Sequence, residues 1–367
     1  MHVPDGFLDA PVSVATGAVA AAAVAVSLRG ARRELEERTA PLAGLVAAFV
    51  FAVQMLNFPV GAGTSGHLLG GALAAVLVGP FTAVLCLSVV LLTQALLFAD
   101  GGLTALGTNI TLMGVVTVVV AHLVFHGLVR VLPRGRRTVG VATFTAAFLS
   151  VPCSAIAFTG LYAIGGTADV SLGRVFAAMT GVHLLIGLGE AAITTATVGA
   201  VLAVRPDLVR AAAGLTRPAL EIRGGATVPA PASVPAPAAG PAAVGAARPA
   251  RALRPLWLTG VAVTLVCAAF VSFYASADPD GLERVATEEG IAEEAEEHGL
   301  ADSPLAAYGV KDVDNERLSV GLAGAAGAAL TLAVGSGVFV AVRRRATAPC
   351  PGPERATGTV RAEPEKV

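Results

Sequence analysis

Long apolar runs separated by short polar segments dominate the chain, and this pattern predicts helices that cross a membrane. A helix needs about 20 mostly apolar residues to span the hydrocarbon core of a bilayer. Counting one short run, the third, we place spans at Ala10–Leu28, Pro41–Phe58, His67–Val78, Phe81–Ala99, Leu103–Val131, Val139–Gly165, Leu172–Val204, Leu256–Ala275 and Leu318–Val342. We interpret the short run as crossing at membrane depth while surrounded by protein. The predicted fold class is an all-α polytopic membrane protein with about nine spans.

Arginine clusters lie in alternate loops between the spans. Their positions predict how the spans are oriented in the membrane. The clusters come after the first, fifth, seventh and ninth runs and consist of Arg29, Arg32, Arg33, Arg38, Arg130, Arg134, Arg136, Arg137, Arg205, Arg210, Arg217, Arg223, Arg343, Arg344 and Arg345. Cytoplasmic loops carry an excess of Lys and Arg. Nine spans with the N-terminus outside put every cluster and the C-terminus on the cytoplasmic side, and the acidic stretch Asp278–Glu316 outside. Because the first ten residues hold Asp5 and Asp9 but no basic residue, we expect no cleaved signal peptide.

The runs divide into a seven-helix bundle and a two-helix C-terminal module. We predict the first domain over residues 1–225 and the second over residues 254–345, with the acidic loop between its two spans. Residues 226–253 are rich in alanine and proline and predict an extended cytoplasmic linker. Residues 346–367 are polar and predict a disordered cytoplasmic tail.

Composition supports a membrane protein and argues against several other classes. The chain is 55% hydrophobic and 14% charged, whereas soluble domains carry about 25% charged residues. A net charge of −1 gives no basic surface for nucleic acid. No GxxxxGK[ST] phosphate loop occurs in the sequence, so we do not expect the chain to hydrolyse ATP. We therefore predict neither an enzyme nor a protein with a resident cofactor.

The dipeptide Met1-His2 is a candidate metal chelator. The terminal amine, the deprotonated amide nitrogen of His2 and the His2 imidazole can close two fused small rings around one ion, and a second histidine can supply a fourth nitrogen. Four nitrogens in a plane suit Ni(II), Cu(II) and low-spin Co(II). His67 lies in the glycine-rich run Gly63–Gly71, and the predicted topology places it on the same side as the N-terminus. On the residues alone, His67 remains either a structural histidine or a ligand.

The other intramembrane polar residues favour structural interpretations. His122 and His126 are four residues apart, near the predicted cytoplasmic end of a span, and suit the headgroup region better than a metal pair. His183 and Glu190 share one helical face and suit a hydrogen bond between helices better than an exit path for an ion. Whether any of these four lies on an ion path stays open, because ionisable groups within spans are often functional.

Gly63-Thr64-Ser65-Gly66 fits the GxSG pattern of rhomboid-like intramembrane serine proteases. His183 would then be the base of a Ser65–His183 dyad. A four-residue pattern is weak in a chain with 42 glycines, and this alternative gives Met1-His2 no role.

Four segments together resemble the CbiM/NikM family. They are MHVPDGFL at the start, NFPVGAGTSGHLLGG (Asn57–Gly71), FADGGLTALGTNI (Phe98–Ile110) and HLLIGLGEAAIT (His183–Thr194). The resemblance extends from Met1 to about Val204. The run DPDGLERVA (Asp278–Ala286), between two spans, resembles the PDGLE domain, which is similar to the small CbiN/NikN subunits and covers about Arg254–Arg345 here.

The resemblance implies a function and a set of site residues. Members of this family are the substrate-binding membrane components of energy-coupling-factor ABC importers for cobalt and nickel. It implies that Met1, through its amine, His2, through its amide and imidazole, and His67 bind the ion in a square plane. Asn109 and Ser65 would contact these ligands without binding the ion and so hold them in position. The family usually has Gly-Ala-Asn where this chain has Gly107-Thr108-Asn109, so local packing is expected to differ there.

The resemblance also implies partners and a location. A separate membrane scaffold, the T component, and soluble ATPase subunits would energise import, and membrane lipid would surround the chain in a bacterial or archaeal plasma membrane. The transported ion would be Co²⁺ or Ni²⁺, for cobalamin biosynthesis or for nickel enzymes, and the sequence does not decide between them. A stand-alone secondary metal transporter is a further alternative.

Overall fold

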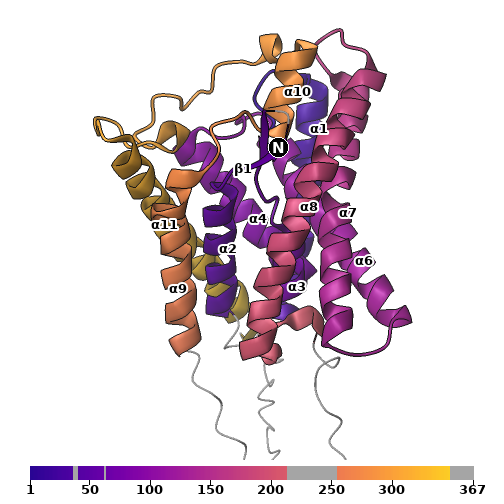
Figure 1. Cartoon of the computed structure of the whole chain (residues 1–367), viewed down its shortest axis with the longest axis vertical. Helices are drawn as coiled ribbons and strands as arrows, with labels where there is room; N and C mark the ends of the chain where they lie inside the picture. Colours follow the sequence, from indigo (N-terminus) through magenta and orange to yellow (C-terminus); the bar gives the residue numbers. More distant parts are fainter. Residues whose placement is uncertain (36–39, 62, 213–253, 348–367) are drawn as a thin grey trace, which may run out of the picture.

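The computed structural model describes residues 1–35, 40–61, 63–212 and 254–347. The predicted linker 226–253 and the predicted tail beyond residue 347 lie outside the described residues. The described elements form one helical bundle, with the N-terminus among helices from both ends of the sequence (Figure 1).

Most of the described chain is helical. The α-helices are α1 (Ala10–Glu34), α2 (Ala40–Gln54), α3 (Gly71–Val78), α4 (Pro80–Thr93), α5 (Leu106–Asn109), α6 (Thr117–Val131), α7 (Arg136–Gly165), α8 (Leu172–Val204), α9 (Arg254–Ala269), α10 (Gly281–Glu289) and α11 (Glu316–Thr347). Two π-helices, η1 (Gln94–Phe98) and η2 (Ile110–Val116), continue α4 and precede α6. Short 3₁₀ turns are η3 (Pro206–Leu208), η4 (Arg210–Ala212), η5 (Val271–Tyr274), η6 (Ile291–Glu294) and η7 (Ala306–Tyr308).

Seven helices of the described chain are long and apolar enough to cross a membrane: Ala10–Glu34, Pro80–Phe98, Leu106–Val131, Arg136–Gly165, Leu172–Val204, Pro255–Tyr274 and Glu316–Arg344. The apolar helix Pro41–Gln54 is shorter, and α3 has only 8 residues. The prediction of a multi-pass membrane protein is therefore confirmed. The count of nine spans includes these two short helices and stays a prediction.

Helix α3 lies at the centre of the bundle, and all of its residues are buried. It contacts α2, α4, α6, α7 and α8, so other helices surround it. Gly70 (φ +79°) and Gly79 (φ +97°) bound the helix in conformations that favour glycine. A segment too short to span lipid alone is thus enclosed by protein, as the sequence analysis expected.

A short antiparallel hairpin precedes α3 and was not expected from the sequence. Strand β1 (Phe58–Gly61) pairs with β2 (Thr64–Gly66), with Phe58 opposite Gly66 and Pro59 opposite Ser65. Strand β2 is completely buried. The hairpin sets the path of the chain into His67, which directly follows β2.

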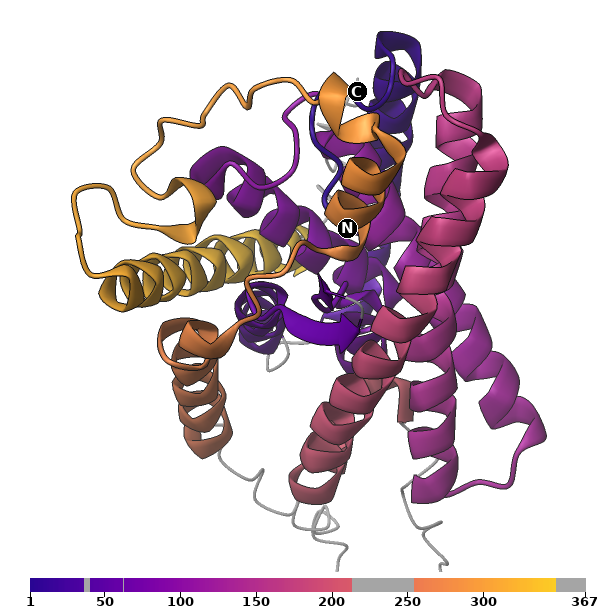
Figure 2. The same ribbon diagram turned by 45° about the horizontal axis from the view of Figure 1, so that its top comes forward.

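The C-terminal module packs against the bundle at two places. Helices α9 and α11 lie beside α2, and α10 lies against α8. Figure 2 shows α10 directly above the N-terminus. The module therefore contributes surface to the region around residue 1.

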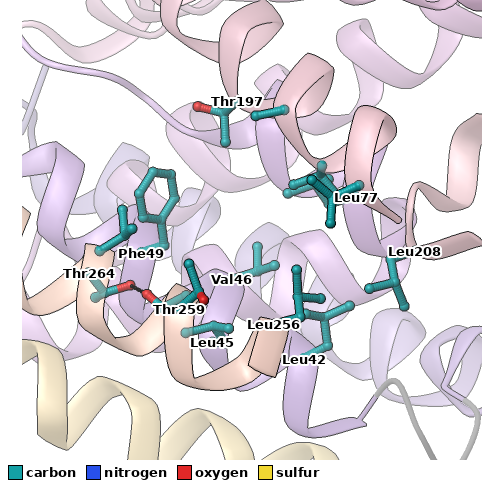
Figure 3. A pocket seen from close by; sticks show the side chains of 15 residues that line it. Leu42, Leu45, Val46, Phe49, Leu77, Thr197, Leu208, Leu256, Thr259 and Thr264 are labelled. Atoms are coloured by element: carbon teal, nitrogen blue, oxygen red, sulfur yellow. Dashed lines mark hydrogen bonds between the residues drawn. The ribbon is translucent and has the colours of Figure 1, made fainter. Parts of the chain in front are cut away.

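The cationic helix ends lie at the opposite end of the bundle from the N-terminus. The turn between α6 and α7 and the C-terminal end of α8 are both at the foot of the view in Figure 1. Arg210 donates from Nη1 to the carbonyl of Glu34 at 2.7 Å, which joins the end of α1 to the segment after α8. An apolar pocket of about 370 Å³ also lies there, between α2, α8 and α9 (Figure 3). Thr197, Thr259 and Thr264 are its only polar lining side chains, so it does not suit a metal ion.

Candidate functional site

The first nine residues form an irregular segment with a turn at Asp5-Gly6, and Asp5 anchors it. The Asp5 carboxylate accepts from the backbone N–H groups of Leu103, Thr104 and Ala105 at 2.8–3.2 Å and from the Thr104 hydroxyl at 2.5 Å. Burial alone would raise the pKa of Asp5, but these hydrogen bonds outweigh it and lower the pKa. The segment is thereby fixed to the loop between η1 and α5.

Asn109 holds the residue that follows His2. Its Oδ1 accepts from the Val3 N–H at 2.8 Å, and its Nδ2 donates to the Val3 carbonyl at 3.0 Å. Gly101 (φ +78°) passes close by: a Cβ there would lie 2.8 Å from Asn109 Nδ2 and 3.4 Å from His2 Nδ1. Asn109 therefore fixes the backbone directly after His2.

The terminal amine of Met1 lies between His67 and Asp280. It is 2.7 Å from His67 Nε2 and donates to Asp280 Oδ2 at 2.8 Å. Asp280 Oδ2 is also 3.5 Å from His67 Nε2. Burial raises the pKa of Asp280, but the terminal ammonium outweighs this and holds it well below its usual range. Asp280 is thus a carboxylate at neutral pH and balances the charge of the amine.

The contact between His67 and its neighbour determines which imidazole nitrogen faces the amine. Nδ1 lies 3.0 Å from the Leu68 carbonyl oxygen, which can only accept, so Nδ1 carries the proton and Nε2 carries the lone pair. Two nitrogens bound side by side to a metal at about 2.0 Å each lie about 2.8 Å apart. The distance of 2.7 Å between the amine and Nε2 fits that arrangement. The amine proton shared with Nε2 occupies the place that an ion would take.

The loop after His67 is held by a buried carboxylate from α8. Glu190 accepts from the backbone N–H groups of Leu69 at 2.5 Å and Gly70 at 3.0 Å. Gln54 of α2 donates to the Leu69 carbonyl at 2.9 Å. Helices α2 and α8 therefore fix the position of His67. The sequence analysis favoured a hydrogen bond between helices for Glu190, whereas its carboxylate binds the backbone of the loop before α3.

The imidazole of His2 lies beside His67 but faces Asp100. The ring centroids are 5.1 Å apart, and His2 Nδ1 is 3.3 Å from Asp100 Oδ1 without hydrogen-bond geometry. Burial lowers the pKa of His2 to about 4, so the ring is neutral at pH 7. Asp100 in turn accepts a hydrogen bond of 2.5 Å from the Tyr308 hydroxyl. A neutral, buried imidazole nitrogen without a hydrogen bond is suited to bind a metal.

Ser65 and His183 do not hydrogen bond to each other. The Ser65 hydroxyl donates to the Asp278 carbonyl at 2.7 Å, and its backbone N–H donates to the Pro279 carbonyl at 2.9 Å. His183 Nδ1 donates to the Met179 carbonyl at 2.8 Å. Ser65 therefore ties the hairpin to the PDGLE motif, and the dyad of the protease alternative is not formed.

The other three histidines within predicted spans are His122 and His126 on α6 and His183 on α8. His122 and His126 on α6 have ring centroids 4.1 Å apart, and His126 Nδ1 donates to the His122 carbonyl at 2.9 Å. His183 is fully buried. It lies next to the PDGLE motif: a Cβ on Gly281 would be 3.2 Å from His183 Cε1. Within the described residues, no three His, Cys, Asp or Glu side chains could together hold a metal ion. A site here therefore depends on backbone nitrogens.

Sequence reasoning missed Asp280 and Asp100 as neighbours of the site. Asp280 belongs to the motif Pro279-Asp280-Gly281-Leu282-Glu283, which identified a domain but gave no contact. Asp100 lies in FADGGLTALGTNI, beside the residues that carried the resemblance. One sequence feature could have identified both residues: each is an aspartate inside a motif and directly precedes a glycine. Glycine lets another segment approach the backbone closely.

Comparisons with known proteins identify the family of both modules. A family model described as the cobalt uptake substrate-specific transmembrane region matches residues 2–208, and the PDGLE domain matches residues 254–344. A putative metal transport protein of Haloquadratum walsbyi is 38% identical over 209 residues, which are 57% of this chain and 93% of that protein. The putative fused nickel transport protein NikMN of Archaeoglobus fulgidus is 38% identical over 224 residues, 60% of this chain and 72% of that protein. The crystal structure of a truncated transition metal transporter covers 55% of this chain and 99% of its own, with 26% identity and a TM-score of 0.49. The resemblance drawn from the sequence motifs is confirmed.

Proposed function

The chain belongs to the cobalt-uptake substrate-specific transmembrane family and carries a PDGLE domain, and from this premise we propose that it captures Co²⁺ or Ni²⁺ for import. The observation that carries the proposal is the distance of 2.7 Å between the Met1 amine and His67 Nε2. The neutral imidazole of His2 lies alongside. The ion is the cargo of this site, not a resident cofactor.

The ion replaces the proton between the amine and His67 Nε2. The His2 amide loses its proton, and its nitrogen joins the plane between the amine and the imidazole. Nδ1 of His2 binds after the ring turns away from Asp100. Four nitrogens in one plane suit Ni(II) and low-spin Co(II) better than Mg²⁺ or Zn²⁺, and loading releases protons, so affinity falls at acid pH.

Charge balance favours burial of this complex. The deprotonated amide reduces the charge of a divalent ion to about +1. Asp280, 3.5 Å from His67 Nε2, supplies one negative charge that offsets it. A buried ion is costly unless it is paired, so this carboxylate lowers the cost of holding the ion.

Import requires energy that this chain does not supply. We propose that separate ATPase subunits and a membrane scaffold provide it, with nine spans, the N-terminus outside and the arginine-rich ends in the cytoplasm. The location of the site at the end opposite the arginine clusters supports this orientation. The metal-transporter relatives favour this function over the protease alternative.

The N-terminal chelate is tested by moving the amine. Purified full-length protein is titrated with Ni²⁺ and Co²⁺ by calorimetry, with and without one extra residue before Met1. We expect the extension and His67→Ala each to weaken binding at least 100-fold, because a ligand is lost or displaced. His122→Ala is the matched control and should bind as wild type. Binding that survives the extension unchanged would exclude the terminal amine as a ligand.

Primary and secondary transport are separated by uptake in cells. We expect accumulation of radioactive Ni²⁺ or Co²⁺ only when the scaffold and ATPase subunits are co-expressed with this chain. Uptake by the chain alone would favour the secondary transporter. Loss of function in Ser65→Ala with metal binding intact would favour the protease.

A further inference from the structure

The apolar pocket between α2, α8 and α9 is a groove that opens toward the membrane (Figure 3). Its volume is about 370 Å³. Val204 of α8 and Val263 of α9 line it, yet their side chains are 63% and 45% exposed. Both residues belong to candidate membrane spans, Leu172–Val204 and Pro255–Tyr274. The groove therefore opens sideways into the hydrocarbon of the membrane, at a place where the two modules meet.

The lining of the groove is almost entirely hydrocarbon. Thr197, Thr259 and Thr264 are its only polar side chains, and the others are aliphatic apart from Phe49 and Gly260. The hydroxyl of Thr264 donates to the Gly260 carbonyl at 2.8 Å, a bond within the helix that satisfies this polar group. The groove therefore suits an occupant made of hydrocarbon.

The groove extends from the arginine-rich end of the bundle toward its middle. Its lining on α9 begins at Leu256, near the start of the helix, and ends at Thr264. At about 1.5 Å per residue, these two residues lie about 12 Å apart along the helix axis. One leaflet contributes about 15 Å of the hydrocarbon core of a bilayer. The length of the groove is therefore close to the depth of one leaflet.

The volume of the groove favours a lipid chain over a helix of another protein. A helix is about 10 Å wide, so a piece about 12 Å long occupies about 900 Å³, more than twice the volume of the groove. With bonds of about 1.5 Å and angles of about 111°, an extended hydrocarbon chain advances about 1.25 Å per carbon, and about ten carbons cover the length of the groove. An acyl chain is therefore the occupant that fits.

Two arginines lie at the end of the groove near the membrane surface. Arg205 directly follows Val204, and Arg210 lies two residues after Leu208. Arg205 pairs with Asp207 at 2.7 Å, whereas Arg210 donates to two backbone carbonyls at 2.7 and 3.4 Å. Carbonyl oxygens have no net charge, so these bonds leave the charge of Arg210 available to an anion. Basic residues between spans at the membrane surface attract anionic headgroups.

We propose that this groove binds one acyl chain of an anionic phospholipid from the leaflet on the arginine side, with the phosphate beside Arg205 and Arg210. The chain contacts α2 and α8 of the N-terminal module and α9 of the PDGLE module, and so joins the two modules within the membrane. This site lies at the opposite end of the bundle from the Met1 amine. It does not depend on the proposed function, and its test uses no metal.

The test fills the groove and measures lipid binding. Purified full-length protein in detergent is titrated with phosphatidylglycerol or phosphatidylcholine that carry the same palmitoyl and oleoyl chains, and bound lipid is counted by native mass spectrometry. We expect one phosphatidylglycerol per chain, bound about fivefold more tightly than phosphatidylcholine because of the arginines. Ala200→Phe places a ring in the groove from an exposed position, so it should weaken this binding about tenfold by taking the space of the acyl chain.

Two further variants separate the groove from the general lipid surface. Thr259→Phe fills the groove from α9, also at an exposed position, and should weaken binding as Ala200→Phe does. Ala196→Phe is the matched control, because Ala196 is exposed on α8 but lies outside the lining, and it should bind lipid as wild type.

Three results would overturn the lipid site. They are equal affinity for the two lipids, unchanged binding in Ala200→Phe, and equal weakening in Ala196→Phe. A lipid-free dimer that Ala200→Phe converts to a monomer would also overturn it, because the occupant would then be a second copy of this chain.

Discussion

At the scale of single residues, hydrogen bonds between side chains and backbone groups fix the site. The Leu68 carbonyl selects the tautomer of His67, and Glu190 holds the two N–H groups that follow. The Asn109 side chain hydrogen bonds to both the backbone N–H and the carbonyl of Val3. Partners of this kind hold a ligand in the orientation in which it binds metal.

Asn109→Ala should weaken Ni²⁺ binding about 10- to 100-fold, the usual effect of losing a residue that supports a metal ligand. Both hydrogen bonds to Val3 disappear, so the His2 amide and ring lose their fixed position. Calorimetric titration measures the change, and Thr111→Ala, whose hydroxyl donates to the Thr16 carbonyl at 3.2 Å, is the control. If Asn109→Ala bound Ni²⁺ as tightly as wild type, Asn109 would not be needed to position the ligands.

The sequence identified the candidate ligands that the structure brings together, but not the residues next to them. Met1, His2 and His67 are recognisable because their donor chemistry is unusual at those positions. Asp280 was not predicted, because the contact joins residues 1 and 280 and no local pattern encodes such a pairing. Ser65 was expected behind the ligands, and it instead ties β2 to the PDGLE motif.

At the scale of elements, the two modules meet where the N-terminal segment passes η6. Gly6 has φ +90°, and the N–H of Glu296 donates to the Asp5 carbonyl at 3.0 Å. A Cβ on Gly6 would lie 2.0 Å from the Glu294 carbonyl oxygen. The close approach of these two backbones therefore requires glycine.

Gly6→Ala should separate η6 from the N-terminal segment. The left-handed conformation alone costs about 1–2 kcal/mol for alanine, and the clash with Glu294 adds to it. Gly290→Ala is the matched control, because Gly290 also has positive φ but a Cβ there meets nothing within 4 Å. Thermal unfolding and hydrogen exchange of residues 291–297 measure the effect. Similar losses in both variants would show that backbone conformation, not the contact, matters.

Periodicity predicted the long helices and missed the irregular elements around the site. Apolar runs locate helices well, but they do not distinguish π-helices such as η1 and η2 from α-helix. The run Leu103–Val131 was treated as one span, and the structure has one candidate span there, Leu106–Val131, in which α5, η2 and α6 follow one another. π-Helices are frequent at functional sites, and here they flank the loop that carries Asp100.

At the scale of the whole molecule, the pH dependence of stability reflects the buried N-terminal segment. The pKa of His2 falls from 6.5 to about 4 through burial, so the unfolded chain binds more protons between these values. Stability is therefore lost as the pH falls from about 6.5 to 4, by at most about 3 kcal/mol. The pKa of Asp280 is lowered below 3.8, so its contribution is lost only at still lower pH.

Thermal unfolding of the metal-free protein from pH 7 to pH 4 checks this expectation. The unfolding midpoint should fall across the window in wild type and fall less in His2→Asn, because asparagine at residue 2 does not titrate. An identical pH profile in the two proteins would mean that His2 is not protonated on unfolding.

The fusion of the PDGLE module has a consequence for how firmly Asp280 must hold the amine. A domain on the same chain acts at a high effective concentration, of millimolar order for a short flexible connection. The packing of α9 and α11 against α2 keeps the module in place even when the contact between α10 and residue 1 opens. The contact between Asp280 and the Met1 amine can therefore break and form again many times while the module stays attached. That contact need not be strong, and it can exchange rapidly.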